Sequence, residues 1–408
     1  MVIESDSQMS VLPDARKMLD QHFGPGGDAG LVSAPGRVNL IGEHIDYHGL
    51  PVLPIAIRRS IRVEFRPRGD RRIRAVSAGS YGLRDFEWTE ALSPTAAGDW
   101  ENYLRAAALA VGQKWGAGRG VDAAIVSDLP AAAGLSSSSA LIVAFTLSLL
   151  RANGYPYTFE ELMEVLPEGE QFVGTRGGGM DHAASLASRE GCASLIEFEP
   201  LSVRSVRVPQ DWGFLVAHSL TMAEKSGAVR QQYNERRVAG TTALQRLGFG
   251  SYGAAIDGRT SSQLEALAEK LPSAEERASF LHVTSEALRV RAAVSAMEHR
   301  DAAAFGSLLL DSHASLRDRL QVSCGALDRL VEAAMASGAL GARLTGAGFG
   351  GCAVVFCRMA DLPTVRDGLI QRFYSGSGEF DERMHLIQAE PGPGALQCLK
   401  EPNASRRL

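Results

Sequence analysis

A glycine-bounded segment near the start of the chain contains four side chains that could bind a polar ligand. Residues 36–47 include Arg37, Glu43, His44 and Asp46. Carboxylates accept hydrogen bonds from hydroxyl groups, and a guanidinium group can bind a phosphate or a carboxylate through two parallel hydrogen bonds. The segment therefore favours a site for a polyhydroxylated ligand. A turn stabilised by surface ion pairs is the alternative.

A second segment, residues 130–140, has a glycine and four serines ahead of an apolar run. Amide groups at the start of a helix are unpaired and lie at the positive end of its dipole, so they can bind phosphate oxygens. A serine hydroxyl can in addition bind Mg²⁺. The alternative is a serine-rich helix cap. The candidate phosphate-binding residues are Gly134, Leu135, Ser136, Ser137 and Ser138.

A third segment places Asp181 two residues after the glycine run 177–179. Glycines leave room for a substrate, so a carboxylate at this position could act as a base. An aspartate that caps a helix is the alternative, and on spacing alone it is slightly favoured.

Two other motifs do not have the context that their chemistry needs. Residues 346–351 satisfy the pattern GxGxxG, but residues 352–356 after them read as a strand, whereas a dinucleotide-binding loop is followed by a helix. Residues 299–301 read His-Arg-Asp, but Gly306 stands where a protein kinase has asparagine. No Walker motif is present.

Composition narrows the class of protein. The 408 residues have a net charge of −5 and 45% hydrophobic residues, and no run of basic residues indicates nucleic acid or an anionic membrane as partner. The longest apolar run, residues 140–150, is too short to cross a bilayer. Five cysteines without CxxC spacing favour a reducing compartment. We therefore predict a cytoplasmic protein that binds small molecules. No feature of the sequence indicates an oligomeric state.

The elements that must position these segments indicate an α+β protein with two domains, residues 1–210 and 211–408. Residues 229–337 have apolar residues at helical spacing, and the three consecutive glycines within 174–180 predict a loop. Strands are predicted at residues 61–65, 121–127, 193–198, 341–345 and 352–356, and helices at 100–113 and 139–150.

The segments together, in this order, resemble the galactokinase family, which belongs to a superfamily with homoserine, mevalonate and phosphomevalonate kinases. Residues 36–47 and 52–54 resemble its sugar signature, 135–140 the shared nucleotide loop, and 344–351 the third, glycine-rich motif. Residues 312–317, Ser-His-Ala-Ser-Leu-Arg, and residues 322–324 also resemble galactokinase sequences. The resemblance implies a ribosomal-protein-S5-like N-terminal domain, a ferredoxin-like C-terminal domain, and an active site in the cleft between them.

The resemblance also implies an ATP- and Mg²⁺-dependent kinase that makes α-D-galactose 1-phosphate. In such an enzyme Asp181 would face the anomeric hydroxyl as the catalytic aspartate, and Arg37 would lie beside it near the γ-phosphate. The implied sugar-binding residues are Glu43, His44, Asp46, Gly179 and Tyr233. On the nucleotide side the implied residues are Trp100 beside adenine, Ser138 and Glu170 beside Mg²⁺, and Gly346 and Gly348 in the third motif.

Some positions depart from the family pattern. His182 stands where the family usually has glutamine, and residues 222–225 are nearer to the N-acetylgalactosamine kinase branch. The 1-kinases of N-acetylgalactosamine, galacturonate and L-arabinose are therefore alternatives. A catalytically silent sensor of sugar and ATP that regulates transcription is a further alternative, against which Asp181 and the intact serine loop argue.

Overall fold

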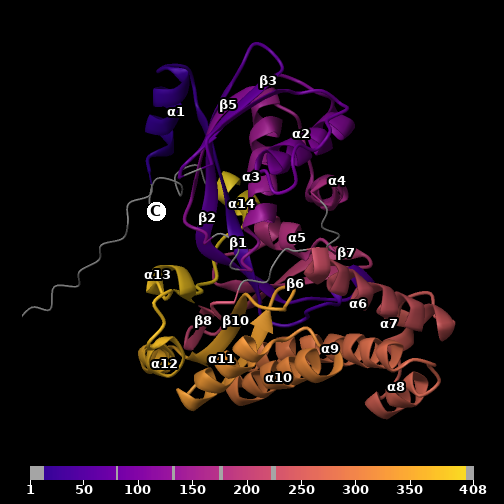
Figure 1. Ribbon diagram of the computed structural model, residues 1–408. Coiled ribbons are helices and arrows are strands. Elements are labelled where there is room, and N and C mark those ends of the chain that lie inside the picture. The colour runs from indigo at the N-terminus through magenta and orange to yellow at the C-terminus, as the bar shows by residue number, and fades with distance from the viewer. Residues whose placement is uncertain (1–12, 80, 131–133, 174–177, 222–226, 401–408) are drawn as a thin grey trace, which may run out of the picture.

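The computed structural model describes residues 13–79, 81–130, 134–173, 178–221 and 227–400. Two stacked halves, each built on its own sheet, make up the fold (Figure 1). Within the described ranges no helix is both long and apolar enough to span a membrane. The predicted α+β class is confirmed.

The N-terminal half contains a five-stranded sheet in the order β1-β2-β5-β3-β4. Its only parallel pair is β3 with β5 among the described strands. The strands are β1 (Gly30–Asn39), β2 (Pro54–Pro67), β3 (Arg72–Ser77), β4 (Leu83–Glu87) and β5 (Val121–Ser127). A two-stranded sheet of β6 (Cys192–Phe198) and β7 (Leu201–Arg207) adjoins it through a bridge between Val52 and Ile196.

Helices cover both faces of this sheet (Figure 1). The central one, α3 (Ser137–Asn153), is apolar on all sides and buried from Ser139 to Leu150, which is typical of a helix enclosed by other elements. It packs against β1 and β2 on one side and α2 (Glu101–Trp115) on the other. The remaining helices are α1 (Ala15–Phe23), which packs on β5 and β2, α4 (Phe159–Phe172) and α5 (Met180–Ala187).

The C-terminal half contains a four-stranded antiparallel sheet in the order β11-β8-β10-β9. Leu215 and Ala217 point into one apolar cluster, whereas Phe214 and Val216 point into another, so both faces of the sheet are buried. This explains why β8 is apolar without alternation. The strands are β8 (Trp212–His218), β9 (Gly341–Thr345), β10 (Cys352–Arg358) and β11 (Leu386–Gln388).

Helices α10, α11 and α12 pack against this sheet, and α6 and α10 pack along α9. The bounds of the helices are α6 (Gly227–Arg246), α7 (Tyr252–Ile256), α8 (Ser261–Ala268), α9 (Ala274–Glu298), α10 (Ala302–Ala314), α11 (Gly325–Ala336), α12 (Leu362–Leu369), α13 (Glu382–His385) and α14 (Ala395–Lys400). Short helical turns are η1 (Asp46–His48), η2 (Ser315–Arg319), η3 (Met359–Asp361) and η4 (Ile370–Tyr374).

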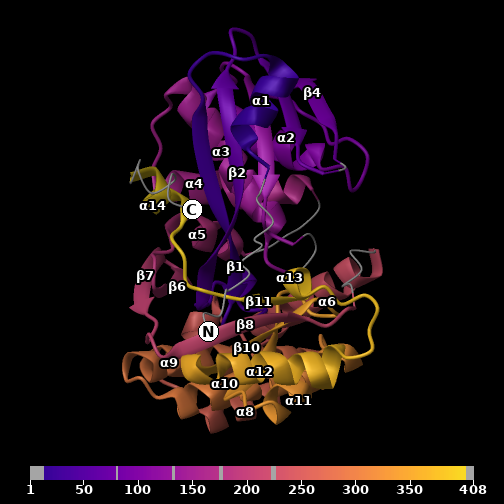
Figure 2. The same ribbon diagram turned by 90° about the vertical axis from the view of Figure 1, so that its left-hand side faces the viewer.

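After β11 the chain returns to the N-terminal half (Figure 2). The amide of Gly392 donates to Ala56 in β2, the amide of Gly394 donates to Ser188, and α14 packs against α5 and β1. The last described residues therefore lie on the N-terminal half, whereas the sequence pattern predicts one C-terminal domain of residues 211–408. A boundary near residue 210 stays a prediction.

The predicted elements agree closely with the observed ones. The strands at residues 121–127 and 341–345 have the predicted bounds, and the strand at residues 352–356 continues to Arg358. Residues 346–351 lead into β10, so the dinucleotide-loop interpretation is excluded, as expected. Of the predicted loop at residues 174–180, residues 174–177 lie outside the described residues, and α5 begins at Met180.

Candidate active site

The first, second and third segments meet at the Asp181 carboxylate, at the start of α5. Arg37 in β1 donates from Nε to Oδ1 of Asp181 at 2.7 Å, and the Ser136 hydroxyl donates to Oδ2. Arg37 also donates from Nη1 to the carbonyl of Gly134 at 2.7 Å, while its backbone amide donates to the carbonyl of Leu135 at 3.1 Å. The Arg37 side chain therefore ties the candidate base to the serine-rich loop.

The electrostatics of this cluster keep Asp181 ionised. Burial opposes ionisation, but the positive charge of Arg37 and the hydrogen bonds from Ser136 and Arg37 outweigh it and lower the pKa of Asp181. Both oxygens accept hydrogen bonds, yet about a quarter of the side chain, 24%, is exposed. Asp181 is thus a charged, oriented acceptor that a ligand can reach.

Neither the Asp181 carboxylate nor the Ser136 hydroxyl acts as the side-chain cap that the alternative interpretations of these segments require. The N-cap of α5 is Gly179, with φ of +98°, and Asp181 is the second residue of the helix. Ser136 is the N-cap of α3, with φ of +56°, but its hydroxyl turns to Asp181 and caps no amide of the helix. The start of α3 therefore lacks a side-chain cap at Ser136, an arrangement that leaves first-turn amides available to an anion.

A second carboxylate, Asp46, lies at the end of the first segment and is bound to the glycine run. Its Oδ2 accepts from the amide of Gly178 at 3.0 Å. Burial, and next the negative charge of Asp181, raise the pKa of Asp46 to about 6. A side chain at Gly178 would collide with this contact, because an added Cβ would lie 2.4 Å from the carbonyl carbon of Asp46.

Three rings, those of His44, Tyr47 and Tyr233, pack against one another at this end of the first segment. The centroid of the Tyr233 ring on α6 lies 5.2 Å from that of His44 and 5.6 Å from that of Tyr47. Burial, and next the charge of Asp46, raise the pKa of Tyr233, which keeps it a phenol that can donate to a ligand. The structure therefore brings Tyr233 close to His44 and within the electrostatic influence of Asp46, and its contact with the sugar stays a prediction.

His44 is a neutral ring that connects the first segment to the glycine-rich motif at residues 344–351. Burial lowers its pKa to about 3. Since Nε2 lies 3.1 Å from the carbonyl of Ala347, it must carry the proton and donate, and Nδ1 then accepts from the Tyr47 hydroxyl at 2.9 Å. His44 has φ of +61°, which is uncommon for a residue other than glycine.

Glu43 is the most enclosed of the four candidate ligand-binding side chains of the first segment, with 2% of the residue exposed. Its Oε2 accepts from Nη2 of Arg343 at 3.0 Å and from the side-chain Nδ2 of Asn39, and its Oε1 accepts from the backbone amide of Gly346. The carboxylate thus joins the first segment to the glycine-rich motif. A contact of Glu43 with the substrate stays a prediction.

The residues implied on the nucleotide side are partly assembled. Gly346 approaches the serine loop, since an added Cβ would lie 3.8 Å from the Gly134 carbonyl, and Gly348 packs on the carbonyl of Val322. Ser137 and Ser138 form the first turn of α3. Glu170 belongs to α4, but its side chain lies outside the described residues. The roles of all of these residues stay predictions.

Trp100 is buried at the start of α2, with 8% of the residue exposed, and its Nε1 donates to the carbonyl of Tyr81 at 2.8 Å. The guanidinium of Arg84 lies over its ring at 5.5 Å. No described contact joins Trp100 to Asp181 or Arg37, and its place beside adenine stays a prediction.

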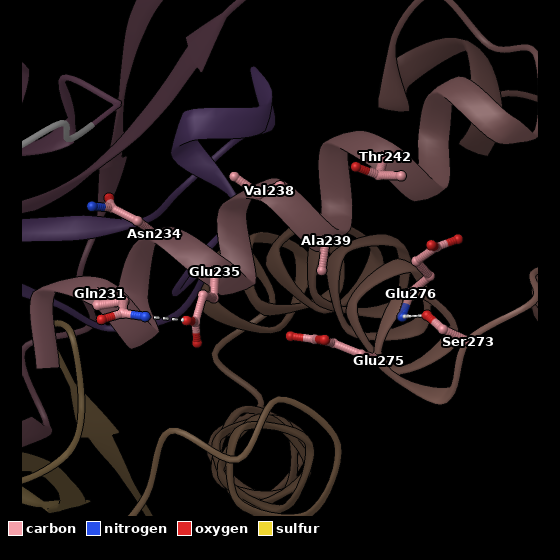
Figure 3. A pocket seen from close by; sticks show the side chains of 9 residues that line it. All are labelled: Gln231, Asn234, Glu235, Val238, Ala239, Thr242, Ser273, Glu275 and Glu276. Atoms are coloured by element: carbon pink, nitrogen blue, oxygen red, sulfur yellow. Dashed lines mark hydrogen bonds between the residues drawn. The ribbon is translucent and has the colours of Figure 1, made fainter. Parts of the chain in front are cut away.

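A large open groove of about 980 Å³ lies elsewhere, between α6 and the start of α9 (Figure 3). Its acidic residues have partners, since Glu275 pairs with Arg236 and Glu276 with Arg246. The groove is lined by Gln231, Asn234, Glu235, Val238, Ala239, Thr242, Ser273, Glu275 and Glu276, none of which is a predicted site residue. The convergence of the three segments, and not the size of a groove, therefore identifies the site.

Comparisons with known proteins agree with this site. A family model of the N-terminal domain of the GHMP kinases matches residues 102–189, and the corresponding C-terminal model matches residues 293–376. The chain therefore has the two parts of a GHMP kinase, a class of ATP-dependent kinases that act on small molecules. A model of the galactokinase galactose-binding signature matches residues 19–67.

Two relatives place the chain within that class. A galactokinase from Roseiflexus sp. (strain RS-1) is 36% identical over 392 residues, which cover 95% of this chain and 98% of that protein. A galactokinase from Chloroflexus aurantiacus is 37% identical over 328 residues, 79% of this chain and 83% of that protein. The chain belongs to the galactokinase family.

The crystal structure of Lactococcus lactis galactokinase complexed with galactose superposes with a TM-score of 0.84 at 26% identity, over 93% of this chain and 97% of that one. Mevalonate kinase of L. major, at 20% identity and a TM-score of 0.59 over 90% and 97% of the two chains, shares the fold. The predicted architecture, an S5-like N-terminal part and a ferredoxin-like C-terminal part, is confirmed.

Proposed function

We propose that this protein transfers the γ-phosphoryl group of ATP to the anomeric hydroxyl of D-galactose and gives α-D-galactose 1-phosphate. The observation that supports this most is the position of Asp181. Its ionised carboxylate is oriented by Arg37 and Ser136 where the sugar signature meets the serine-rich loop. An acceptor of this kind can hold the attacking hydroxyl in line and take its proton.

Arg37 has two functions in this proposal. It keeps Asp181 ionised, and its guanidinium lies between that carboxylate and the loop carbonyl of Gly134. Because phosphoryl transfer has a loose transition state with charge on the peripheral oxygens, positioning and cationic stabilisation supply most of the catalysis. Arg37 and the first-turn amides of α3 are the groups of this chain that can stabilise that charge.

The proposal includes Mg²⁺ bound together with the phosphates of ATP. The hydroxyl of Ser138 and the carboxylate of Glu170 would be its protein ligands, and oxygen donors of this kind fit the preference of Mg²⁺. Because the Ser136 side chain caps no amide of α3, the first-turn amides of this helix are available to bind the phosphates of ATP. When bound, Mg²⁺ neutralises charge on those phosphates. We also propose a cytoplasmic location, since five scattered cysteines without CxxC spacing favour a reducing compartment.

A coupled assay of ADP release with five sugars tests this function. Galactose is expected to have the highest kcat/KM, and glucose a low one, because one inverted hydroxyl leaves buried polar groups unmatched at about 1–3 kcal/mol each. N-acetylgalactosamine, galacturonate and L-arabinose complete the panel. A value for any of them about tenfold above that for galactose overturns the sugar. Binding of sugar and ATP without ADP release would instead identify a sensor.

The raised pKa of Asp46 predicts a pH dependence of sugar use. Below pH 6, where Asp46 takes up a proton, kcat/KM for galactose is expected to fall by about tenfold per pH unit, because the side chain loses acceptor capacity. Because the pKa of Asp46 is higher in the folded protein than in the unfolded chain, protonation of Asp46 stabilises the fold. This stabilisation is fully present below the unfolded pKa and is lost as the pH rises through 6, so protonation of Asp46 does not cause unfolding at pH 5.5. An Asp46→Asn variant should lack the inflection, and persistence of the inflection near pH 6 in that variant would refute the assignment.

The contact between Gly178 and Asp46 predicts that even a methyl side chain at residue 178 lowers the activity. In Gly178→Ala the new Cβ must displace the backbone of Asp46 and Tyr47, which it would otherwise approach within 2.4–2.5 Å. A shift of about 1 Å at a reacting site can lower the rate about 10²-fold, so we expect kcat/KM for galactose to fall by that order. Gly250→Ala is the matched control, since a Cβ there meets nothing within 4 Å. Equal activity of both variants would contradict the geometry.

A further inference from the structure

Two backbone groups of the first segment, at residues 42 and 43, form hydrogen bonds with side chains of α9, which is far away in the sequence. The amide of Gly42 donates to Oε1 of Glu286 at 3.0 Å, and the carbonyl of Glu43 lies 3.0 Å from Nε2 of His282. His282 and Glu286 are four residues apart, so they lie on one face of the helix, and neither is exposed. Together they hold the two backbone groups next to His44.

A second layer of side chains fixes these two residues. The Ser312 hydroxyl donates to Oε1 of Glu286 at 2.7 Å, while Arg289 donates from Nε to its Oε2 at 2.8 Å. The Ser315 hydroxyl lies 2.9 Å from Nδ1 of His282. Ser312 and Ser315 belong to the Ser-His-Ala-Ser motif, whose role the sequence alone does not indicate. Helix α10, which contains Ser312, runs beside α9 (Figure 1).

The hydrogen bonds determine which nitrogen of His282 is protonated. The carbonyl of Glu43 only accepts, so Nε2 must carry the proton, and Nδ1 then accepts from Ser315. Burial lowers the pKa of His282 to about 4, in keeping with a neutral ring. Removal of the Ser315 hydroxyl would leave Nδ1 buried without a donor, and the ring would then be held only through Nε2.

The backbone of residues 42–44 has a conformation that its surroundings must stabilise. Gly42 has φ of +105° and His44 has φ of +61°, and His44 reaches both Tyr47 and Ala347 from this conformation. A non-glycine residue persists in this region of φ only when its surroundings hold it there. The α9 contacts act on the two residues that precede His44, where a change in the backbone moves both His44 and Asp46.

We propose that two pairs of residues form a relay of hydrogen bonds that positions residues 42–44 of the first segment for galactose. The first arm of the relay is Ser315 with His282, and the second arm is Ser312 with Glu286. These are positioning residues, since they act through the backbone of Gly42 and Glu43. The inference rests on the proposed function. It assigns the Ser-His-Ala-Ser motif to sugar binding and not to the nucleotide.

Two substitutions of His282 test the first arm. A glutamine amide extends as far from Cβ as Nε2 of histidine, so His282→Gln keeps a donor for Glu43, whereas the shorter His282→Asn keeps a polar group only near Ser315. We expect His282→Asn to raise KM for galactose at least about tenfold and His282→Gln less than about threefold, with KM for ATP within about threefold of the parent in both. His299→Asn, at the exposed end of α9, is the matched control.

A Ser315→Ala change provides the second readout. It should raise KM for galactose in the parent but cause no further rise in the His282→Gln background, because the hydroxyl acts through Nδ1 of His282. Melting temperatures of all variants identify any loss that follows from unfolding alone. The relay is overturned if the Asn and Gln variants have equal KM for galactose, if the loss falls equally on ATP, or if the Ser315 effect adds in full. An inactive parent would overturn the proposed function instead.

Discussion

Asp181→Asn is expected to lower kcat by about 10²- to 10⁴-fold while galactose still binds. Asparagine has nearly the same shape, but it lacks the negative charge that Arg37 stabilises and cannot accept the proton of the attacking hydroxyl. The hydrogen bond from Ser136 can still reach the amide oxygen, so the start of α5 should keep its conformation. Steady-state kinetics and calorimetric binding of galactose measure the two effects separately.

The control for this variant is Asp367→Asn, which changes an exposed aspartate on α12. It should have the kinetics of the parent. If Asp181→Asn retained kcat within a few-fold of the parent, Asp181 would not be the acceptor of the proton. If both kcat and galactose binding were lost together with the fold, the carboxylate would be a structural partner of Arg37.

Arg343→Met is expected to have the largest effect on stability. The Arg343 side chain is completely buried and donates from Nη1 to the carbonyls of Asn39 at 3.1 Å and Leu40 at 3.0 Å, and from Nη2 to Glu43 at 3.0 Å. Its loss leaves the Glu43 carboxylate buried without a compensating charge, which costs about 3–5 kcal/mol. Urea denaturation followed by tryptophan fluorescence measures the change in the free energy of unfolding.

Two further variants complete this test. Replacing both partners, Glu43→Gln with Arg343→Met, should recover a large part of the loss, because a neutral amide is cheaper to bury than an unpaired charge. Arg329→Met removes an exposed arginine from α11 and should change stability by less than about 0.5 kcal/mol. If Arg343→Met lost no more stability than Arg329→Met, the buried ion pair of Arg343 with Glu43 would not contribute to the stability of the fold.

Local patterns made much of the fold and the centre of the site predictable. The strands at residues 121–127 and 341–345 follow from β-branched and apolar runs between turns, and the helix of residues 139–150 from its apolar length. Arg37 and Asp181 were singled out by residue type next to glycine. Their 2.7 Å contact joins positions 144 residues apart, and the family resemblance, not the spacing, indicated that they are neighbours.

The supporting residues could not be found in the same way. Arg343 lies within an apolar strand, and its partner Glu43 is 300 residues away, so no local pattern relates them. The turn of Ser136 toward Asp181 depends on a φ of +56° that the sequence does not specify. His282 and Glu286 offered one usable signal, two titratable residues at a spacing of four among the apolar residues of a long helix.

The product of the reaction tests the central claim most directly. The protein is incubated with ATP, Mg²⁺ and D-galactose, and the mixture is analysed by phosphorus and proton NMR. The account predicts one phosphate ester, on the anomeric carbon in the α configuration, formed in equal amount with ADP. An ester on any other carbon, or ADP formed with free phosphate and unchanged galactose, would contradict it.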